Sequence, residues 1–93
     1  PNPPFLIDVR TPSETAEQDN RIEGAHIIPL DTIRHALKHD ADLREAKGGD
    51  VVIICRSGQR AGIAAWLMKR SGFEHCFILS GGIEAWKEDE SGI

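Results

Sequence analysis

Four short apolar runs, rich in isoleucine, valine and leucine, punctuate the sequence. Two of them, residues 5–9 and 51–54, are nearly continuous instead of alternating with polar positions. Such runs are typical of strands covered on both faces, as in a parallel sheet. The other two, residues 26–30 and 75–79, predict shorter strands beside them.

The segments between these runs have the end signals of helices. Thr11-Pro12-Ser13-Glu14 fits a capping box, in which Thr11 is the N-cap and Glu14 reaches back to it. This short polar helix should end before Asp19. Strands that alternate with helices indicate an α/β fold, and 93 residues suffice for a single domain.

Two further helices are predicted in the middle of the chain. Asp31 is expected to cap the first of them, with Ile33 and Leu37 facing inward. Residues 40–47 predict a polar helix that closes at Gly48.

The strongest helix signal covers residues 59–70, and Gly72 should stop this helix. A last helix is expected over residues 83–90, with Trp86 packed inward; Trp66 of the earlier helix is assigned to packing as well. The apolar stripe predicted for residues 59–70 consists of Ile63, Ala64, Leu67 and Met68.

The net charge of −4 and the pI near 5.5 give no sign of a basic surface for nucleic acid or anionic lipid. No apolar run approaches the ~20 residues that span a bilayer, and residues 1–4 do not look like a signal peptide. We therefore expect a cytoplasmic protein with neither membrane nor nucleic-acid partners.

The two cysteines, Cys55 and Cys76, form no CxxC pair, which favours reduced thiols and disfavours a zinc site. His35 and His39 have a metal-ligand spacing, but with no third ligand nearby a solvated helix face is the better interpretation. No metal or cofactor is expected.

Cys55 stands at the end of a buried strand and precedes a polar loop that leads into the helix at 59–70. Loop amides and the positive end of that helix can form a cradle for an anion at this place. Arg56 and Arg60 add positive charge, and Ser57 adds a hydroxyl donor. These features favour the thiolate, so the sequence predicts a nucleophilic cysteine that needs no histidine base.

Cys76 is the contrasting case, because it lies inside a predicted strand without a glycine loop or an adjacent basic residue. We expect it to be a packed, structural cysteine. His26 is not assigned to the Cys55 site.

Four motifs in order give the chain a resemblance to the rhodanese family. Residues 6–14 resemble its early strand–turn motif and residues 24–29 its second motif. Residues 55–60 resemble its active-site loop, and residues 80–86 its closing motif. The resemblance implies a single domain over residues 1–93, with an open parallel sheet of four to five strands and helices on both faces.

The same resemblance implies a sulfurtransferase of the thiosulfate type. Cys55 would carry a sulfane sulfur as a persulfide, from a small donor anion such as thiosulfate to a thiol or cyanide acceptor, or to a sulfur-accepting protein. Asp8 and Arg10 would support the loop through ion pairs. The donor anion would be held by Arg56, Ser57, Gly58, Gln59 and Arg60.

Two departures from the family pattern stand out. Only four residues precede Phe5, whereas the family usually has a short helix and a first strand there, so an edge element would be missing or replaced. In the second motif, Arg21 stands where the family commonly has a histidine, which should alter a surface contact but not the chemistry.

Two other functions compete with sulfur transfer. Cysteine phosphatases have a similar layout but need five residues between cysteine and arginine, whereas four separate Cys55 from Arg60. The tighter loop disfavours phosphoryl transfer. A non-catalytic regulatory or protein-binding domain is the other alternative, because fold alone does not fix function.

Overall fold

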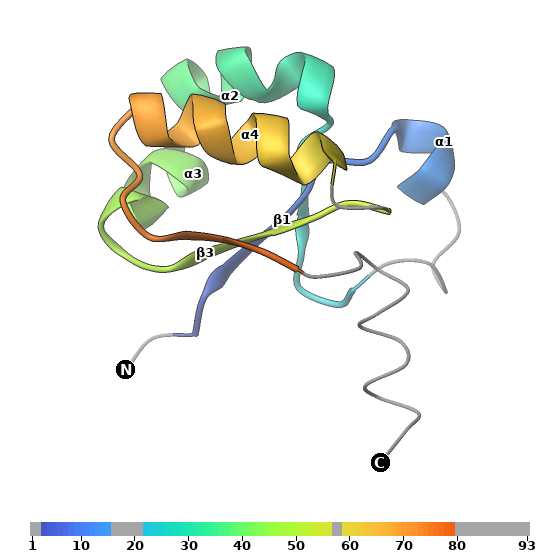
Figure 1. Ribbon diagram of the computed structural model, residues 1–93, viewed down its shortest axis with the longest axis horizontal. Coiled ribbons are helices and arrows are strands. Elements are labelled where there is room, and N and C mark those ends of the chain that lie inside the picture. Colours follow the sequence, from blue (N-terminus) through green and yellow to red (C-terminus); the bar gives the residue numbers. More distant parts are fainter. Residues whose placement is uncertain (1–2, 16–21, 57–58, 80–93) are drawn as a thin grey trace.

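The computed structural model describes residues 3–15, 22–56 and 59–79, and of Glu14 it describes the backbone only. Four parallel strands form one sheet in the order β2-β1-β3-β4 (Figure 1). Strands and helices alternate along the chain as the sequence predicted. The elements are β1 (Phe5–Asp8), α1 (Pro12–Thr15), β2 (His26–Ile27), α2 (Ile33–His39), α3 (Ala41–Glu45), β3 (Val51–Ile54), α4 (Gln59–Arg70) and β4 (Cys76–Ile78), with short 3-10 helices η2 (Leu30–Thr32) and η3 (Ala46–Gly48).

The two central strands provide the frame of the sheet. β1 and β3 pair at four successive positions, from Phe5 opposite Val51 to Asp8 opposite Ile54. Because parallel strands end on the same side of a sheet, this register brings the residues after β1 and those after β3 to a common edge. Cys55 and Arg10 therefore belong to neighbouring strand ends.

The main core lies between the sheet and the helices α2, α3 and α4, which Figure 1 shows together on one side of the sheet. Ile7 and Ile53 of the central strands are fully buried there, as are Ile33 of α2 and Leu43 of α3. Alternate strand residues face the other side, where Leu6 and Ile54 belong to a second, smaller apolar cluster. The helix expected over residues 83–90, including Trp86, lies outside the described residues.

The strand predicted at residues 26–30 is shorter than expected. β2 covers only His26–Ile27, although residues 26–30 were predicted. Beyond it the chain still follows β1, because the Ile28 amide donates to the Asp8 carbonyl at 2.9 Å and the Leu30 amide to the Val9 carbonyl at 3.2 Å. Pro29 lies between them and has no N–H to continue a regular ladder.

The predicted cap at Asp31 is wrong. Asp31 lies within η2, and α2 begins after Thr32, which makes no side-chain cap. The reason is a tight turn on Pro29, whose carbonyl accepts hydrogen bonds from both the amide and the hydroxyl of Thr32, each at 2.9 Å.

Two other helix starts agree with the sequence. Asp40 caps α3, where its Oδ1 accepts a hydrogen bond from the Leu43 amide at 3.0 Å. α1 begins at Pro12, and the Thr15 amide donates to the Thr11 carbonyl at 3.1 Å. The predicted reach of the Glu14 side chain lies outside what the structure describes.

The bounds of α4 match the prediction, and its predicted stripe is confirmed in part, because Ala64 and Met68 are buried and Leu67 packs partly buried against the core. Ile63 and Trp66 are exposed by 53% and 57%, so the assignment of both to the core is wrong. Alanines let a helix approach a sheet closely, and three of them occupy the interface in place of the large side chains. The buried residues of α4 are Ala61, Ala64, Ala65 and Met68.

Met68 and Ile63 of α4 test this assignment on a single helix. Met68→Ala should lower the free energy of unfolding by about 2–5 kcal/mol, because it leaves a cavity in the main core. Ile63→Ala should change it by less than about 0.5 kcal/mol, since the side chain is half exposed. Urea denaturation followed by circular dichroism measures both. Equal losses in the two variants would contradict the buried face described here.

Candidate active site

Cys55 follows β3 directly and is fully buried within the main core cluster. Its Sγ accepts a hydrogen bond from the backbone N–H of Ala61 at 3.4 Å. Ala61 is the third residue of α4, so this N–H belongs to the first turn, whose amides have no partner within the helix. The positive end of α4 therefore faces the sulfur and stabilises negative charge on it.

This contact identifies a functional group that sequence reasoning had not named. The sequence predicted that the start of α4 would approach Cys55, but not which amide would do so. The signal was the spacing, because six residues from the cysteine lead through the loop into the first helical turn.

The loop residues expected to bind a donor anion are only partly described. Arg56 follows Cys55 and is exposed, whereas Gln59 and Arg60 open α4, the former exposed and the latter half-buried. Ser57 and Gly58 lie outside the described residues, so an amide cradle in that part of the loop stays a prediction.

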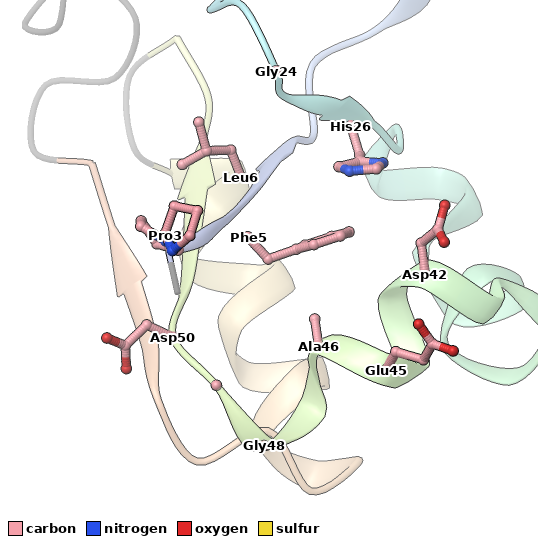
Figure 2. Close-up of a pocket in the computed structure, with 12 residues that line it drawn as sticks. Pro3, Phe5, Leu6, Gly24, His26, Asp42, Glu45, Ala46, Gly48 and Asp50 are labelled. Atoms are coloured by element: carbon pink, nitrogen blue, oxygen red, sulfur yellow. The ribbon is translucent and has the colours of Figure 1, made fainter. Parts of the chain in front are cut away.

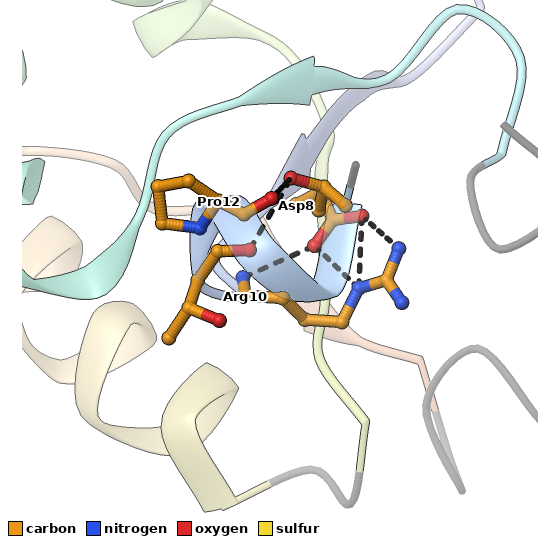
Figure 3. Close-up of polar contacts among 5 residues, drawn as sticks. Asp8, Arg10 and Pro12 are labelled. Carbon is orange, nitrogen blue, oxygen red and sulfur yellow. Dashed lines mark hydrogen bonds and ion pairs between the residues drawn. The ribbon is translucent and has the colours of Figure 1, made fainter. Parts of the chain in front are cut away.

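Asp8 and Arg10 form a buried ion pair at the end of β1 (Figure 3). Arg10 Nη2 lies 2.8 Å from Asp8 Oδ2, and Arg10 Nε lies 3.0 Å from Oδ1, which is the two-pronged geometry favoured by arginine and carboxylate. The Arg10 amide also donates to Asp8 Oδ1 at 3.1 Å. The pair therefore fixes the course of the chain as it leaves the strand.

The ion pair lies at the same edge of the sheet as Cys55. Asp8 is opposite Ile54 in the register. The Val9 amide donates at 3.0 Å to the Ile54 carbonyl, which belongs to the peptide bond between Ile54 and Cys55. Support of the Cys55 loop by this pair stays a prediction.

Thr15 is a buried polar residue that the sequence had not singled out. Its hydroxyl is shared between the carbonyls of Thr11 and Pro12, each at 3.2 Å, which closes the short helix α1. A threonine in the fourth helical position is the signal for such a bond to the preceding turn.

Cys76 does not belong to the site. It begins β4, opposite Val51 at the other end of β3, and packs as a partly buried residue against the main core. Burial raises the pKa of its thiol above the ordinary 9.0, while Lys69 opposes this shift more weakly. Both cysteines are free thiols, which agrees with the sequence-based interpretation.

A separate hollow lies at the opposite end of the strands from Cys55, where β1 and β3 begin (Figure 2). It measures about 870 Å³ and includes His26, whose ring stacks on Phe5 with 4.2 Å between centroids. His26 thus lies away from Cys55. In the parts of the chain that the structure describes, no three histidine, cysteine or acidic side chains gather as a metal site would require.

Comparison with known proteins identifies the family. The model of the family "Rhodanese-like domain" matches residues 1–89. The chain belongs to the rhodanese-like domain family. Within the described ranges, no helix of this rhodanese-like domain is long and apolar enough to span a membrane.

Two relatives illustrate the range of proteins that contain the domain. The chain is 36% identical over 82 residues to "Sulfurtransferase" of Allochromatium vinosum, covering 88% of this chain and 70% of that protein. It is 34% identical over 89 residues to "Adenylyltransferase and sulfurtransferase MOCS3-2" of Zea mays, covering 94% of this chain but 18% of that protein. The chain spans 18%, 43% and 19% of three curated relatives that it matches well.

The solved structures support the fold. Human single-domain sulfurtransferase TSTD1 superimposes with a TM-score of 0.73 and 26% identity, covering 91% of this chain and 81% of that one. The rhodanese fold inferred from the sequence motifs is therefore confirmed for this rhodanese-like domain.

Removal of one partner of the buried ion pair should be costly. Arg10→Met leaves the Asp8 carboxylate buried without its cation and should lower the free energy of unfolding by about 3–5 kcal/mol. The double variant Asp8→Leu/Arg10→Met should recover a large part of this loss, since it leaves no lone charge. Chemical denaturation measures both, with substitution of the exposed Arg34 of α2, Arg34→Met, as the control. A single variant as stable as the control would contradict the pairing.

The raised pKa of Cys76 predicts slow alkylation. A raised pKa means that less thiolate is present at any given pH, so the rate of labelling by iodoacetamide should reach its midpoint above pH 9.0. The measurement uses Cys55→Ser, in which Cys76 is the remaining thiol, and intact mass at a series of pH values. A midpoint below 9.0 would show that Lys69 outweighs burial.

Proposed function

We propose that this domain is a sulfurtransferase that takes a sulfane sulfur from a small anion such as thiosulfate and carries it on Cys55 as a persulfide. The observation that carries the proposal is the hydrogen bond from the Ala61 amide to Cys55 Sγ. A helix N-terminus directed at the sulfur stabilises the negative charge that it carries when it attacks a donor or leaves the persulfide. Membership of a family with relatives named sulfurtransferases supports the same chemistry.

The loading step is a displacement at sulfur. The Cys55 thiolate attacks the outer sulfur of thiosulfate, a new S–S bond forms, and the old S–S bond breaks with its electron pair leaving on sulfite. The products are a Cys55 persulfide anion and sulfite, so charge and atoms balance. Arg56 and Arg60 would attract the doubly charged donor and the leaving sulfite.

The unloading step restores the enzyme. An acceptor thiolate or cyanide attacks the outer sulfur of the persulfide, and the electron pair of the broken S–S bond returns to Cys55. The Ala61 amide would stabilise the developing charge on Cys55 in this step.

Burial of the sulfur suggests which donors fit. Cys55 has no exposed surface, so a compact anion reaches it more readily than a bulky disulfide. Once loaded, the outer sulfur stands about 2 Å beyond Sγ, which is the length of an S–S bond. A larger acceptor therefore has less far to reach than the donor.

A sulfurtransferase assay tests the proposal. With thiosulfate and cyanide the domain should form thiocyanate, and intact mass should show a gain of about one sulfur atom (~32 Da) on Cys55. Cys55→Ser should abolish both signals by removal of the nucleophile. Cys76→Ser should retain them within about twofold, because Cys76 lies opposite Val51, at the other end of β3 from Cys55.

The controls address the two alternatives. Hydrolysis of an aryl phosphate, abolished by Cys55→Ser, would favour a phosphatase in spite of the four-residue loop. A folded protein that neither forms thiocyanate nor gains mass would sink the sulfurtransferase hypothesis and favour a non-catalytic binding domain.

A further inference from the structure

The outer side of α4 carries large side chains that the fold does not use. Ile63 and Trp66 are more than half exposed, whereas the opposite side of the helix packs on the core through alanines and Met68. The guanidinium of Arg70 lies 4.9 Å from the centre of the Trp66 ring, so the indole is held by a cation–π contact. We call Ile63, Trp66, Lys69 and Arg70 the α4 face; their helical spacing places them on one side.

Basic and acidic residues are unevenly distributed between the sequence around α4 and the rest of the chain. Residues 51–73 contain four basic residues and no acidic one, although the whole chain has 11 basic and 15 acidic residues. The remaining seven basic and all 15 acidic residues therefore lie elsewhere in the sequence. The α4 face is a positively charged, partly apolar surface on an acidic protein.

Distance separates this surface from the small donor. A helix of 12 residues is about 18 Å long, and Cys55 contacts its first turn whereas Lys69 and Arg70 end it. A small anion at Cys55 cannot also contact the far end of the helix. A macromolecule that lies along α4 can contact both.

We propose that the α4 face docks the protein that accepts sulfur from Cys55. The partner would place an apolar side chain against Ile63 and Trp66, and carboxylates against Lys69 and Arg70, with its thiol directed toward the start of α4. This inference rests on the proposed sulfurtransferase function and names the acceptor for that same site. The surface is small, as expected for a weak and transient complex.

The charge pattern argues for an acidic protein, not for a nucleic acid. The Trp66 ring carries Arg70 on one face, which leaves it less open to stack on bases. A polyanionic strand would also meet the 15 acidic residues of the rest of the chain. Ile63 offers an apolar contact that suits a protein side chain.

In the transfer itself, the partner's cysteine thiolate attacks the outer sulfur of the Cys55 persulfide. An S–S bond forms between the partner's sulfur and the transferred sulfur, and the bond to Cys55 breaks. The electron pair of that bond returns to Cys55 as thiolate, and the transferred sulfur keeps its negative charge in the partner's persulfide, so no external oxidant or reductant is needed.

Defined peptides serve as probes of the docking. One synthetic peptide carries a single cysteine, two leucines and several glutamates; its matched partner has lysines in place of the glutamates. The persulfide of the wild-type domain should transfer sulfur to the acidic peptide at least about tenfold faster than to the lysine peptide. Intact mass follows loss of the extra sulfur from the domain and its gain by the peptide.

Variants of the α4 face should separate docking from chemistry. Ile63→Ser, Trp66→Ala and the double variant Lys69→Gln/Arg70→Gln should each slow transfer to the acidic peptide about tenfold. The same variants should transfer sulfur to cyanide within about twofold of wild type. The matched control is Ile27→Ser, which should change neither rate. Ile27 is an exposed isoleucine on β2, the outer strand on the far side of the sheet from β4.

Three outcomes would overturn the docking proposal. These are equal rates with the two peptides, α4-face variants that slow transfer to cyanide as much as transfer to the peptide, and α4-face variants that transfer sulfur to the acidic peptide as fast as Ile27→Ser.

Binding of the acidic peptide by calorimetry is measured in parallel and does not require a persulfide. Binding lost in the α4-face variants but without sulfur transfer would refute the proposed function and retain the surface. Tighter binding of a single-stranded RNA, lost in those same variants, would replace the protein partner with a nucleic acid.

Discussion

The parallel pairing of β1 with β3 is the constraint on which the rest of this structure depends. Four residue pairs in register bury Ile7 and Ile53 between the sheet and the helices. The same pairing ends both strands at one edge, where Asp8 lies opposite the residue before Cys55. A shift by one residue would turn every side chain of a strand to the other face, so the core and the site are specified together.

At the end of these strands, an ion pair and the first turn of a helix stabilise the local structure. The buried Asp8–Arg10 pair stabilises the exit from β1, and the first turn of α4 presents its Ala61 amide to the Cys55 sulfur. Neither arrangement needs a flexible side chain to reach far. Two residues along one strand end make the ion pair, and the backbone makes the contact to sulfur. This local construction suits a domain with few residues available for a second layer of support.

Much of the architecture could be predicted from the sequence, because continuous apolar runs and glycine stops report directly on buried strands and helix ends. β3 and α4 have the predicted bounds, and Cys55 lies at the predicted junction between them. The wrong predictions concern which of several similar residues is buried or caps a helix. Nothing in the sequence of α4 says that Ala61 and Ala65, and not Ile63 and Trp66, face the sheet, since that depends on how closely helix and sheet approach. Asp31 lost its capping role to a turn centred on the Pro29 carbonyl, a competition between neighbours that residue preferences do not rank.

The position of Cys76 has a consequence for how a loaded domain is emptied. Cys76 of β4 lies opposite Val51, and Val51 precedes Cys55 by four residues along β3, which places the Cα atoms of the two cysteines on the order of 13 Å apart. A disulfide needs Cα atoms within about 7 Å, so Cys76 cannot act as a resolving thiol for a persulfide on Cys55. Under the proposed sulfur transfer, a persulfide on Cys55 would therefore pass its sulfur to an acceptor other than Cys76, and the rate of transfer would depend on encounter with that acceptor.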